Sequence, residues 1–164
     1  MNIIKMLRKV SLKNLIRLLA LGIYHPLFLL PTLKATKQCV TMANRYYGQL
    51  HHQNGPANAF RHALWNFLIA QKCTEWSNNS KKVLAWTKKI TDWHEYTFLN
   101  DELAQKMDFH NNATGRYLFK ANGSNSVSSV IAQLKTLTEN SIFIDGNTNV
   151  APYKNQLVHI IKNE

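Results

Sequence analysis

The chain has 164 residues, of which 45% are hydrophobic, and this length and composition predict one globular domain over residues 1–164. Its two cysteines, Cys39 and Cys73, are too few for a disulfide scaffold, and neither belongs to a CxxC or Cys/His finger pattern, which argues against a structural zinc site of that kind. Lys and Arg number 20 against nine Asp and Glu, a formal net charge of +11.

The positive charge is concentrated in the first half of the chain. Glu75 is the first acidic residue, and half of the 20 basic residues precede it. Such an asymmetry creates a positive field that attracts anionic lipid headgroups or a phosphodiester backbone. We therefore expect an anionic membrane surface as the partner, with nucleic acid as the alternative. The expected location is cytoplasmic or peripheral to a membrane, or outside the cell for a secreted effector.

The first 30 residues form a basic amphipathic segment. Residues 3–21 place Leu, Ile and Val near one helical face and most Lys and Arg around the other, a pattern that suits a membrane interface. The apolar run at 18–31 is interrupted by His25 and Pro26 and is shorter than the roughly 20 residues that span a bilayer. We interpret it as a helix break and apolar corner that either dips into a membrane surface or packs under the domain.

The rest of the chain predicts a mostly helical domain. Proline, glycine and capping residues delimit helices over 32–49, 56–73, 81–99, a segment starting after Asn100, and 127–139. Residues 141–150 are predicted as a short hairpin, followed by a final apolar stretch at 157–161. The expected fold class is all-α, a compact multi-helix bundle with a small irregular or β element near the C-terminus. Its parts are the segment 1–30, a motif-bearing helical core 31–120, and a C-terminal helix and tail 121–164.

The helix predicted at 56–71 carries a polar strip on an otherwise apolar surface. It contains no Lys, Asp or Glu, so it lacks the residues of a solvated face. At about 100° per residue, Asn58, His62 and Asn66 line one narrow strip, with Arg61 beside it. A helix that is apolar nearly all round is buried, and a strip of this kind then needs hydrogen-bonding partners or a ligand.

Two later helices supply candidate partners for the strip. In the helix at 81–99, His94 falls at the centre of the apolar stripe and Glu95 lies about 100° away. In the next helix one side is shared by Asp108, Asn111, Asn112 and Gly115, and Arg116 stands four residues after Asn112. Glycine within a helix costs about 1 kcal/mol relative to alanine, so we expect a close approach to the backbone at Gly115.

These residue types suit hydrolytic chemistry. Histidine and carboxylate groups activate water or bind a divalent ion, while Asn and Arg hold an anionic group. The predicted catalytic residues are His62, His94, Glu95 and Asp108. The predicted substrate-binding residues are Asn58, Arg61, Asn66, Asn111, Asn112 and Arg116. A divalent metal ion is the candidate cofactor, with His62, His94, Glu95, Asp108 and His110 as candidate ligands.

Three functions are compatible with these features. The leading hypothesis is a hydrolase that acts at an anionic membrane surface on a lipid ester or phosphodiester. A metal-dependent nuclease is the first alternative, although the basic residues near the N-terminus alternate with Leu and Ile rather than with stacking aromatics. The second is a helical membrane-binding or partner-binding module without catalysis, in which the polar strip only fixes helix packing.

Three motifs resemble those of a poorly characterised bacterial domain family. NAFRHALWN at 58–66, WHE at 93–95 and MDFHNNATGR at 107–116 are similar to its pattern NAxRHAxWN, HE and MDxHNNxxGR. The resemblance covers roughly residues 31–120. Domains of this kind lie at the C-termini of larger bacterial proteins with a toxin-like organisation, which implies an antibacterial effector. By position, the resemblance implies a site made of Asn58, Arg61, His62, Asn66, His94, Glu95, Asp108, Asn111, Asn112 and Arg116.

Overall fold

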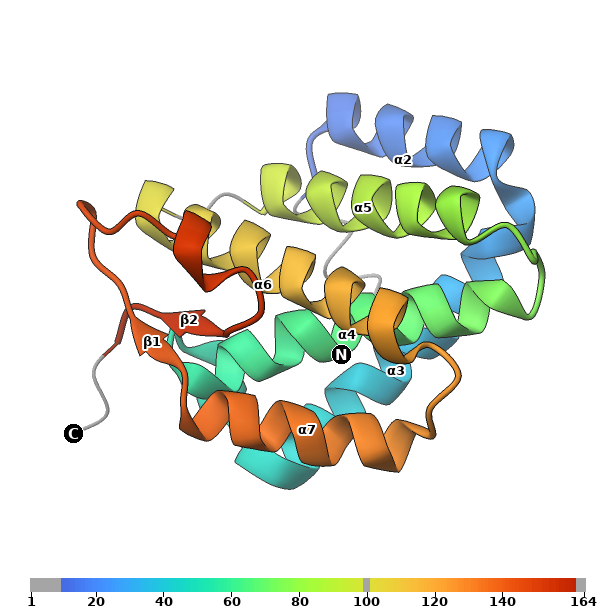
Figure 1. Ribbon diagram of the computed structural model, residues 1–164. Helices are drawn as coiled ribbons and strands as arrows, with labels where there is room; N and C mark the ends of the chain where they lie inside the picture. Colours follow the sequence, from blue (N-terminus) through green and yellow to red (C-terminus); the bar gives the residue numbers. More distant parts are fainter. Residues whose placement is uncertain (1–9, 99–100, 162–164) are drawn as a thin grey trace.

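The computed structural model describes residues 10–98 and 101–161 (Figure 1). Within these ranges the chain is mostly helical and has one small sheet, which confirms the predicted all-α class. The α-helices are α2 (Leu12–Tyr24), α3 (Pro26–Tyr47), α4 (Pro56–Thr74), α5 (Ser80–Thr97), α6 (Glu102–Asn122) and α7 (Val127–Glu139). The short elements are the 3₁₀ turns η1 (Leu50–His52) and η2 (Ala151–Tyr153) and the strands β1 (Ile142–Phe143) and β2 (Val158–His159).

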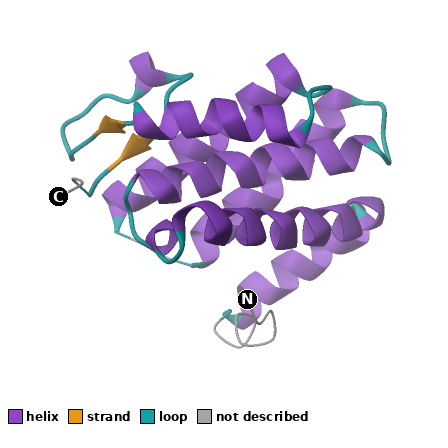
Figure 2. Ribbon diagram, turned by 90° about the horizontal axis from the view of Figure 1, so that it is seen from below, coloured by secondary structure: helices purple, strands orange, loops and turns teal. Residues whose placement is uncertain are grey.

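Helix α4 forms the centre of the bundle and contacts α3, α5, α6 and α7 (Figures 1 and 2). Thirteen of its 19 residues are buried, as the absence of Lys, Asp and Glu from its first 16 positions predicts. Its large apolar side chains, such as Phe60 and Phe67, join Trp86 of α5 and Leu134 of α7 in the main hydrophobic core. Any polar residue on α4 therefore lies inside the molecule unless it is at an edge.

The helix starts follow from local sequence. Side chains of Asn79, Asp101 and Ser126 accept hydrogen bonds from backbone amides in the first turns of α5, α6 and α7. Pro56 begins α4, where its missing amide is not needed. Asn100, the predicted cap of α6, lies outside the described residues, and the observed cap is Asp101.

The N-terminal helices differ from the prediction in where the first helix ends and where the second begins. Residues 3–9 of the predicted helix at 3–21 lie outside the described ranges, and α2 covers Leu12–Tyr24. The chain breaks at His25 as expected, but α3 begins at Pro26 and Pro31 lies inside it. Because proline has no amide hydrogen, Pro31 leaves the carbonyl of Leu27 without its usual helical partner, and Leu27 is an exposed residue.

The predicted hairpin at 141–150 is wrong. Strand β1 pairs with β2 in parallel, with Ile142 opposite Val158 and Phe143 opposite His159. The prediction fails because β2 is held by a helix rather than by a turn. Asn111 of α6 donates to the Val158 carbonyl at 2.9 Å and accepts from its amide at 3.0 Å.

Candidate functional site

The crossing of α4 and α6 sets the site. A Cβ atom at Gly115 would lie 2.2 Å from the Ala63 carbonyl oxygen, so only glycine permits this approach. The close approach expected at this glycine is confirmed. His62 and Asn66 lie just before and after Ala63 along α4, and the crossing sets them against the polar side of α6.

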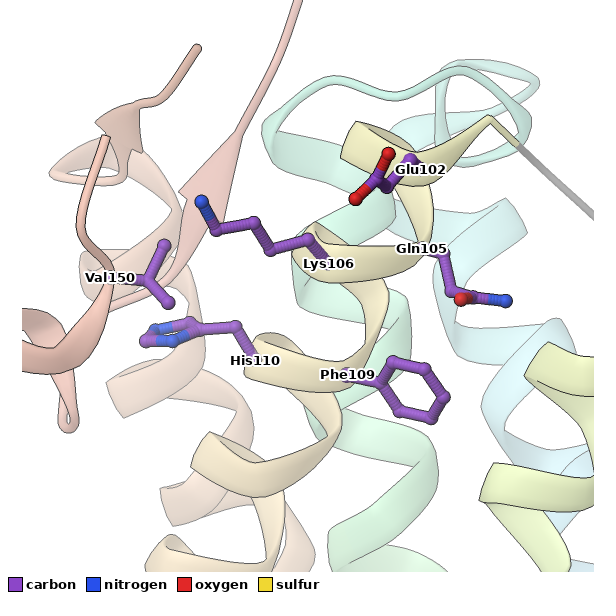
Figure 3. Close-up of a pocket in the computed structure, with 6 residues that line it drawn as sticks. All are labelled: Glu102, Gln105, Lys106, Phe109, His110 and Val150. Carbon is purple, nitrogen blue, oxygen red and sulfur yellow. The ribbon is translucent and has the colours of Figure 1, made fainter. Parts of the chain in front are cut away.

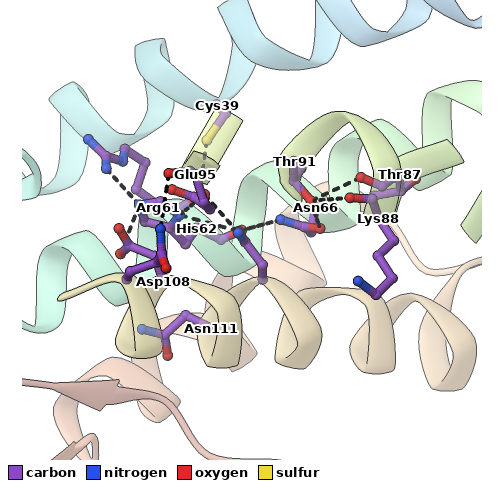
Figure 4. Close-up of polar contacts among 12 residues, drawn as sticks. Cys39, Arg61, His62, Asn66, Thr87, Lys88, Thr91, Glu95, Asp108 and Asn111 are labelled. Carbon is purple, nitrogen blue, oxygen red and sulfur yellow. Dashed lines mark hydrogen bonds and ion pairs between the residues drawn. The ribbon is translucent and has the colours of Figure 1, made fainter. Parts of the chain in front are cut away.

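Three titratable side chains from three helices meet beside this crossing (Figure 4). His62 Nδ1 lies 3.4 Å from Glu95 Oε1, and His62 Nε2 lies 3.3 Å from Asp108 Oδ1. All three side chains are buried, with His62 only 2% exposed. We call this set the His62 centre. The fold thus brings one imidazole and two carboxylates together, as the sequence predicted.

Asn112 connects Glu95, His62 and Asn66 on the Nδ1 side of the His62 centre. Its amide nitrogen donates to Glu95 Oε1 at 2.8 Å, and its oxygen accepts from the Asn66 amide nitrogen at 2.6 Å. The same oxygen lies 3.2 Å from His62 Nδ1. Because an amide oxygen only accepts hydrogen bonds, this contact assigns the ring proton to Nδ1.

Arg61 fixes the state of the other ring nitrogen. Its guanidinium Nη2 lies 2.7 Å from His62 Nε2, and a guanidinium has donors but no acceptors. Nε2 therefore accepts, and its lone pair faces both Arg61 and Asp108. Arg61 is partly exposed while His62 is buried, so the guanidinium is the member of this contact that meets solvent.

Glu95 is an anion throughout the physiological range. Burial alone would raise its pKa, but the hydrogen bond and electrostatic interaction with His62, the nearby His94 ring and the hydrogen bond from Asn112 outweigh burial and lower the pKa to about 2. A buried carboxylate that stays charged beside Nδ1–H holds the imidazole in one orientation. This is the role of the third group in a hydrolytic triad.

The strip continues from the His62 centre toward Arg116. Asn66 Oδ1 accepts from Arg116 Nη1 at 2.8 Å and from Thr91 Oγ1 at 3.2 Å. Arg116 is thus connected to the His62 centre through Asn66 and Asn112. Sequence reasoning missed Thr91, although its position four residues before Glu95 puts both on the same helical face.

Three predicted site residues lie apart from the His62 centre. His94 packs between the rings of Trp65 and Phe98, with centroid distances of 5.1 and 4.8 Å, and burial lowers its pKa to about 4. The prediction that His94 occupies the centre of the buried face of α5 is wrong, since Glu95 is buried there and His94 is only partly so. Asn111 holds β2, as described above.

His110 also lies elsewhere, in a surface pocket between α6 and the C-terminal region (Figure 3). Its Nε2 lies 3.0 Å from the Gln156 carbonyl oxygen, which makes this nitrogen a donor rather than a metal ligand. The pocket is lined by Glu102, Gln105, Lys106, Phe109, His110 and Val150, and by none of the three residues of the His62 centre.

Asn58 is buried one turn before His62 on the strip. Its side-chain oxygen has no hydrogen-bond partner among the residues that the structure describes. An acceptor left in this state is costly, so a bound water or a ligand donor is expected there.

The His62 centre fits a divalent cation by its donors and spacing. One ligand atom from each of His62, Glu95 and Asp108 can be chosen so that all lie within 4.8 Å of one another. Nε2 and Asp108 Oδ1, 3.3 Å apart, match the edge of about 3.4 Å expected for a tetrahedron with bonds of about 2.1 Å. Glu95, on the Nδ1 side, is placed to orient the imidazole of a metal-bound histidine.

Comparisons with known proteins give a family but no activity. A family model described as "Domain of unknown function (DUF6973)" matches residues 19–142, more than half of the chain, and the chain belongs to this family. Neither the curated proteins nor the solved structures contain a significant match.

Proposed function

We propose that this member of the family is a hydrolase, that its active site is the His62 centre, and that its substrate is the ester or phosphodiester of an anionic lipid. One observation carries the proposal. A buried histidine is held by a charged carboxylate on Nδ1 while its unprotonated Nε2 faces a second carboxylate and an arginine. This arrangement has the parts of a general base with its orienting group and an anion-binding group.

In the proposed reaction, Nε2 of His62 accepts a proton from water as the water oxygen attacks the ester carbon or the phosphorus. Glu95 keeps the ring oriented and stabilises the imidazolium that forms. The imidazolium then returns the proton to the leaving alkoxide. Arg61 binds the anionic group of the substrate, and this contact draws the guanidinium away from Nε2 and uncovers it.

The spacing of His62 and Asp108 favours a version of this mechanism that uses a divalent cation. Such an ion would supply Lewis-acid activation of the same water. In that case Nε2 and Asp108 would hold the cation once Arg61 has left Nε2, and Glu95 would keep its orienting role. A chelator separates the two versions, because only the second loses turnover with it.

Lipid turnover on anionic vesicles tests the proposal. The wild-type protein is mixed with phosphatidylglycerol vesicles, with and without chelator, and release of fatty acid or headgroup is measured. We expect His62→Gln and Asp108→Asn to lower turnover by roughly 100-fold or more. Glu139→Gln is the matched control, since Glu139 is an exposed carboxylate at the end of α7, outside the polar strip. Absence of wild-type turnover, or full turnover by His62→Gln, would overturn the proposal.

A metal-dependent nuclease is the second candidate, favoured by the same centre together with the net charge of +11. It predicts salt-sensitive cleavage of DNA or RNA that Asp108→Asn abolishes. If the variants change only the melting temperature and no activity, the polar strip serves packing in a binding module. Action on lipids would suit the antibacterial effector that the motif resemblance implies.

A further inference from the structure

Helix α2 exposes a row of aliphatic side chains. Leu12, Ile16, Leu19 and Ile23 lie on one side of the helix and are between 57% and 77% exposed. No residue of α2 is fully buried, although the helix is strongly apolar. Large aliphatic side chains gathered on one face, rather than scattered, mark a surface that another molecule covers.

Helix α3 also exposes leucine side chains, just after the break at His25. Leu27, Leu30 and Leu33 of α3 are each at least half exposed. No single helix in the described ranges is long and apolar enough to cross a bilayer, but α2 and α3 meet the criterion as a pair, bent by 116°. We call the seven exposed side chains the apolar corner.

The apolar corner belongs to a helix that is packed on the domain. Leu18 and Leu21 of α2 contact the main core, and Trp93 of α5 donates to the Asn14 carbonyl at 2.9 Å. In Figure 1, α2 lies along α5, the helix that carries Glu95. The exposed row is therefore the outer side of a fixed helix, whose inner side already has its partners.

The charged residues beside the apolar corner indicate which kind of surface binds there. Lys13 and Arg17 of α2 and Lys34 of α3 are exposed, and no acidic residue occurs before Glu75. Two copies of this face would repel each other, whereas an anionic surface would be attracted to it. Aliphatic side chains flanked by Lys and Arg are the composition of helices that lie in a membrane interface.

We propose that the apolar corner docks the protein on an anionic lipid bilayer, with the aliphatic side chains of α2 and α3 in the boundary between headgroups and acyl chains. The docking needs no catalysis. One part of this inference rests on the function proposed above: docking would bring lipid substrate close to α5, the helix that contributes Glu95 to the His62 centre.

Vesicle sedimentation tests the docking. The probe is a vesicle of phosphatidylglycerol and phosphatidylcholine, compared with phosphatidylcholine alone. We expect the double variant Ile16→Ser/Ile23→Ser to bind the anionic vesicle at least about tenfold more weakly than wild type. The matched control, Trp76→Ser/Tyr117→Ser, removes two exposed aromatic side chains, one from the turn after α4 and one from α6, and should bind like wild type.

A fluorescent label locates the contact. Burial raises the pKa of both native thiols to about 12, so an introduced surface cysteine reacts selectively. A polarity-sensitive dye on Leu19→Cys should shift to the blue and be quenched by lipid-borne quenchers. The same dye on Ser129→Cys, exposed on α7, should not.

Four results would overturn the docking: no binding of wild type to anionic vesicles, equal binding to neutral ones, equal loss in both double variants, or a dimer that Ile16→Ser/Ile23→Ser dissociates. The last would assign the apolar corner to a second copy of the chain. Asp108→Asn separates the two proposals, because it should bind vesicles like wild type. Binding without turnover by wild type would refute the proposed function and leave the docking intact.

Discussion

Polar side chains are usually exposed and apolar ones buried, and the His62 centre and the apolar corner break this pattern in opposite ways. The first places two carboxylates, an imidazole and several amides inside the bundle, and the second places seven large aliphatic side chains outside it. In the interior Asn112 and Asn66 bond to neighbouring polar groups, although the side-chain oxygen of Asn58 has no partner among the described residues. On the surface no side chain of the described protein covers the aliphatic row. The first departure is thus mostly balanced within the chain, and the second requires a partner outside it.

Gly115→Ala gives the largest expected effect, because it attacks the packing that assembles the interior site. The added Cβ would overlap the Ala63 backbone, so α4 and α6 must separate. We expect a loss of about 3 kcal/mol in the free energy of unfolding, despite the better helix propensity of alanine. Denaturant unfolding measures it. Gly146→Ala, where nothing lies within 4 Å of the new Cβ, should change little; equal losses would contradict this account of the crossing.

The pH dependence of stability probes the charge of the interior site. The pKa of Glu95 is about 2 in the folded protein against an ordinary value of 4.5. A lowered carboxyl pKa adds stability that is complete above about pH 4.5 and is lost as the pH falls toward 2. We expect Glu95→Gln to cost about 2 kcal/mol near neutral pH and progressively less below pH 4.5. The exposed Glu139→Gln is the control, and a pH-independent cost of Glu95→Gln would contradict the assignment.

Substitution in the apolar corner gives the smallest expected effect. Ile16→Gln and Leu19→Gln replace exposed side chains without removing core contacts. We expect the free energy of unfolding in the absence of lipid to change by less than about 0.5 kcal/mol for each. Thermal or denaturant unfolding checks this. A loss above about 1 kcal/mol would mean that the row packs within the protein, and the comparison between the two regions would fail.

Much of the interior site could be predicted from helical spacing. His62 and Asn66 recur at the helical period in a helix whose first 16 positions contain no Lys, Asp or Glu, and Asp108 and Asn112 do so on a second helix. The structure pairs these two strips across the crossing that Gly115 permits. His94 shows where spacing fails: adjacent residues of α5 differ by about 100°, and the apolar stripe alone did not tell whether His94 or Glu95 faces inward.

For the apolar corner, the local structure could be predicted but its packing could not. Its sequence predicts a basic, apolar helix and a break at His25, and both are confirmed within the described residues. The sequence left open whether this corner packs under the domain. The structure packs one side of α2, which stays partly exposed, against the domain and leaves the other side open to solvent.

The sequence by itself determined the helices, the burial of α4 and the identity of the polar groups, because periodicity and composition are local properties. Tertiary structure alone decided that Glu95 rather than His94 joins His62, and that Asn111 holds β2. It also decided that β1 and β2 pair in parallel. These outcomes depend on contacts between residues far apart in the chain, whose geometry is set by how closely whole helices approach.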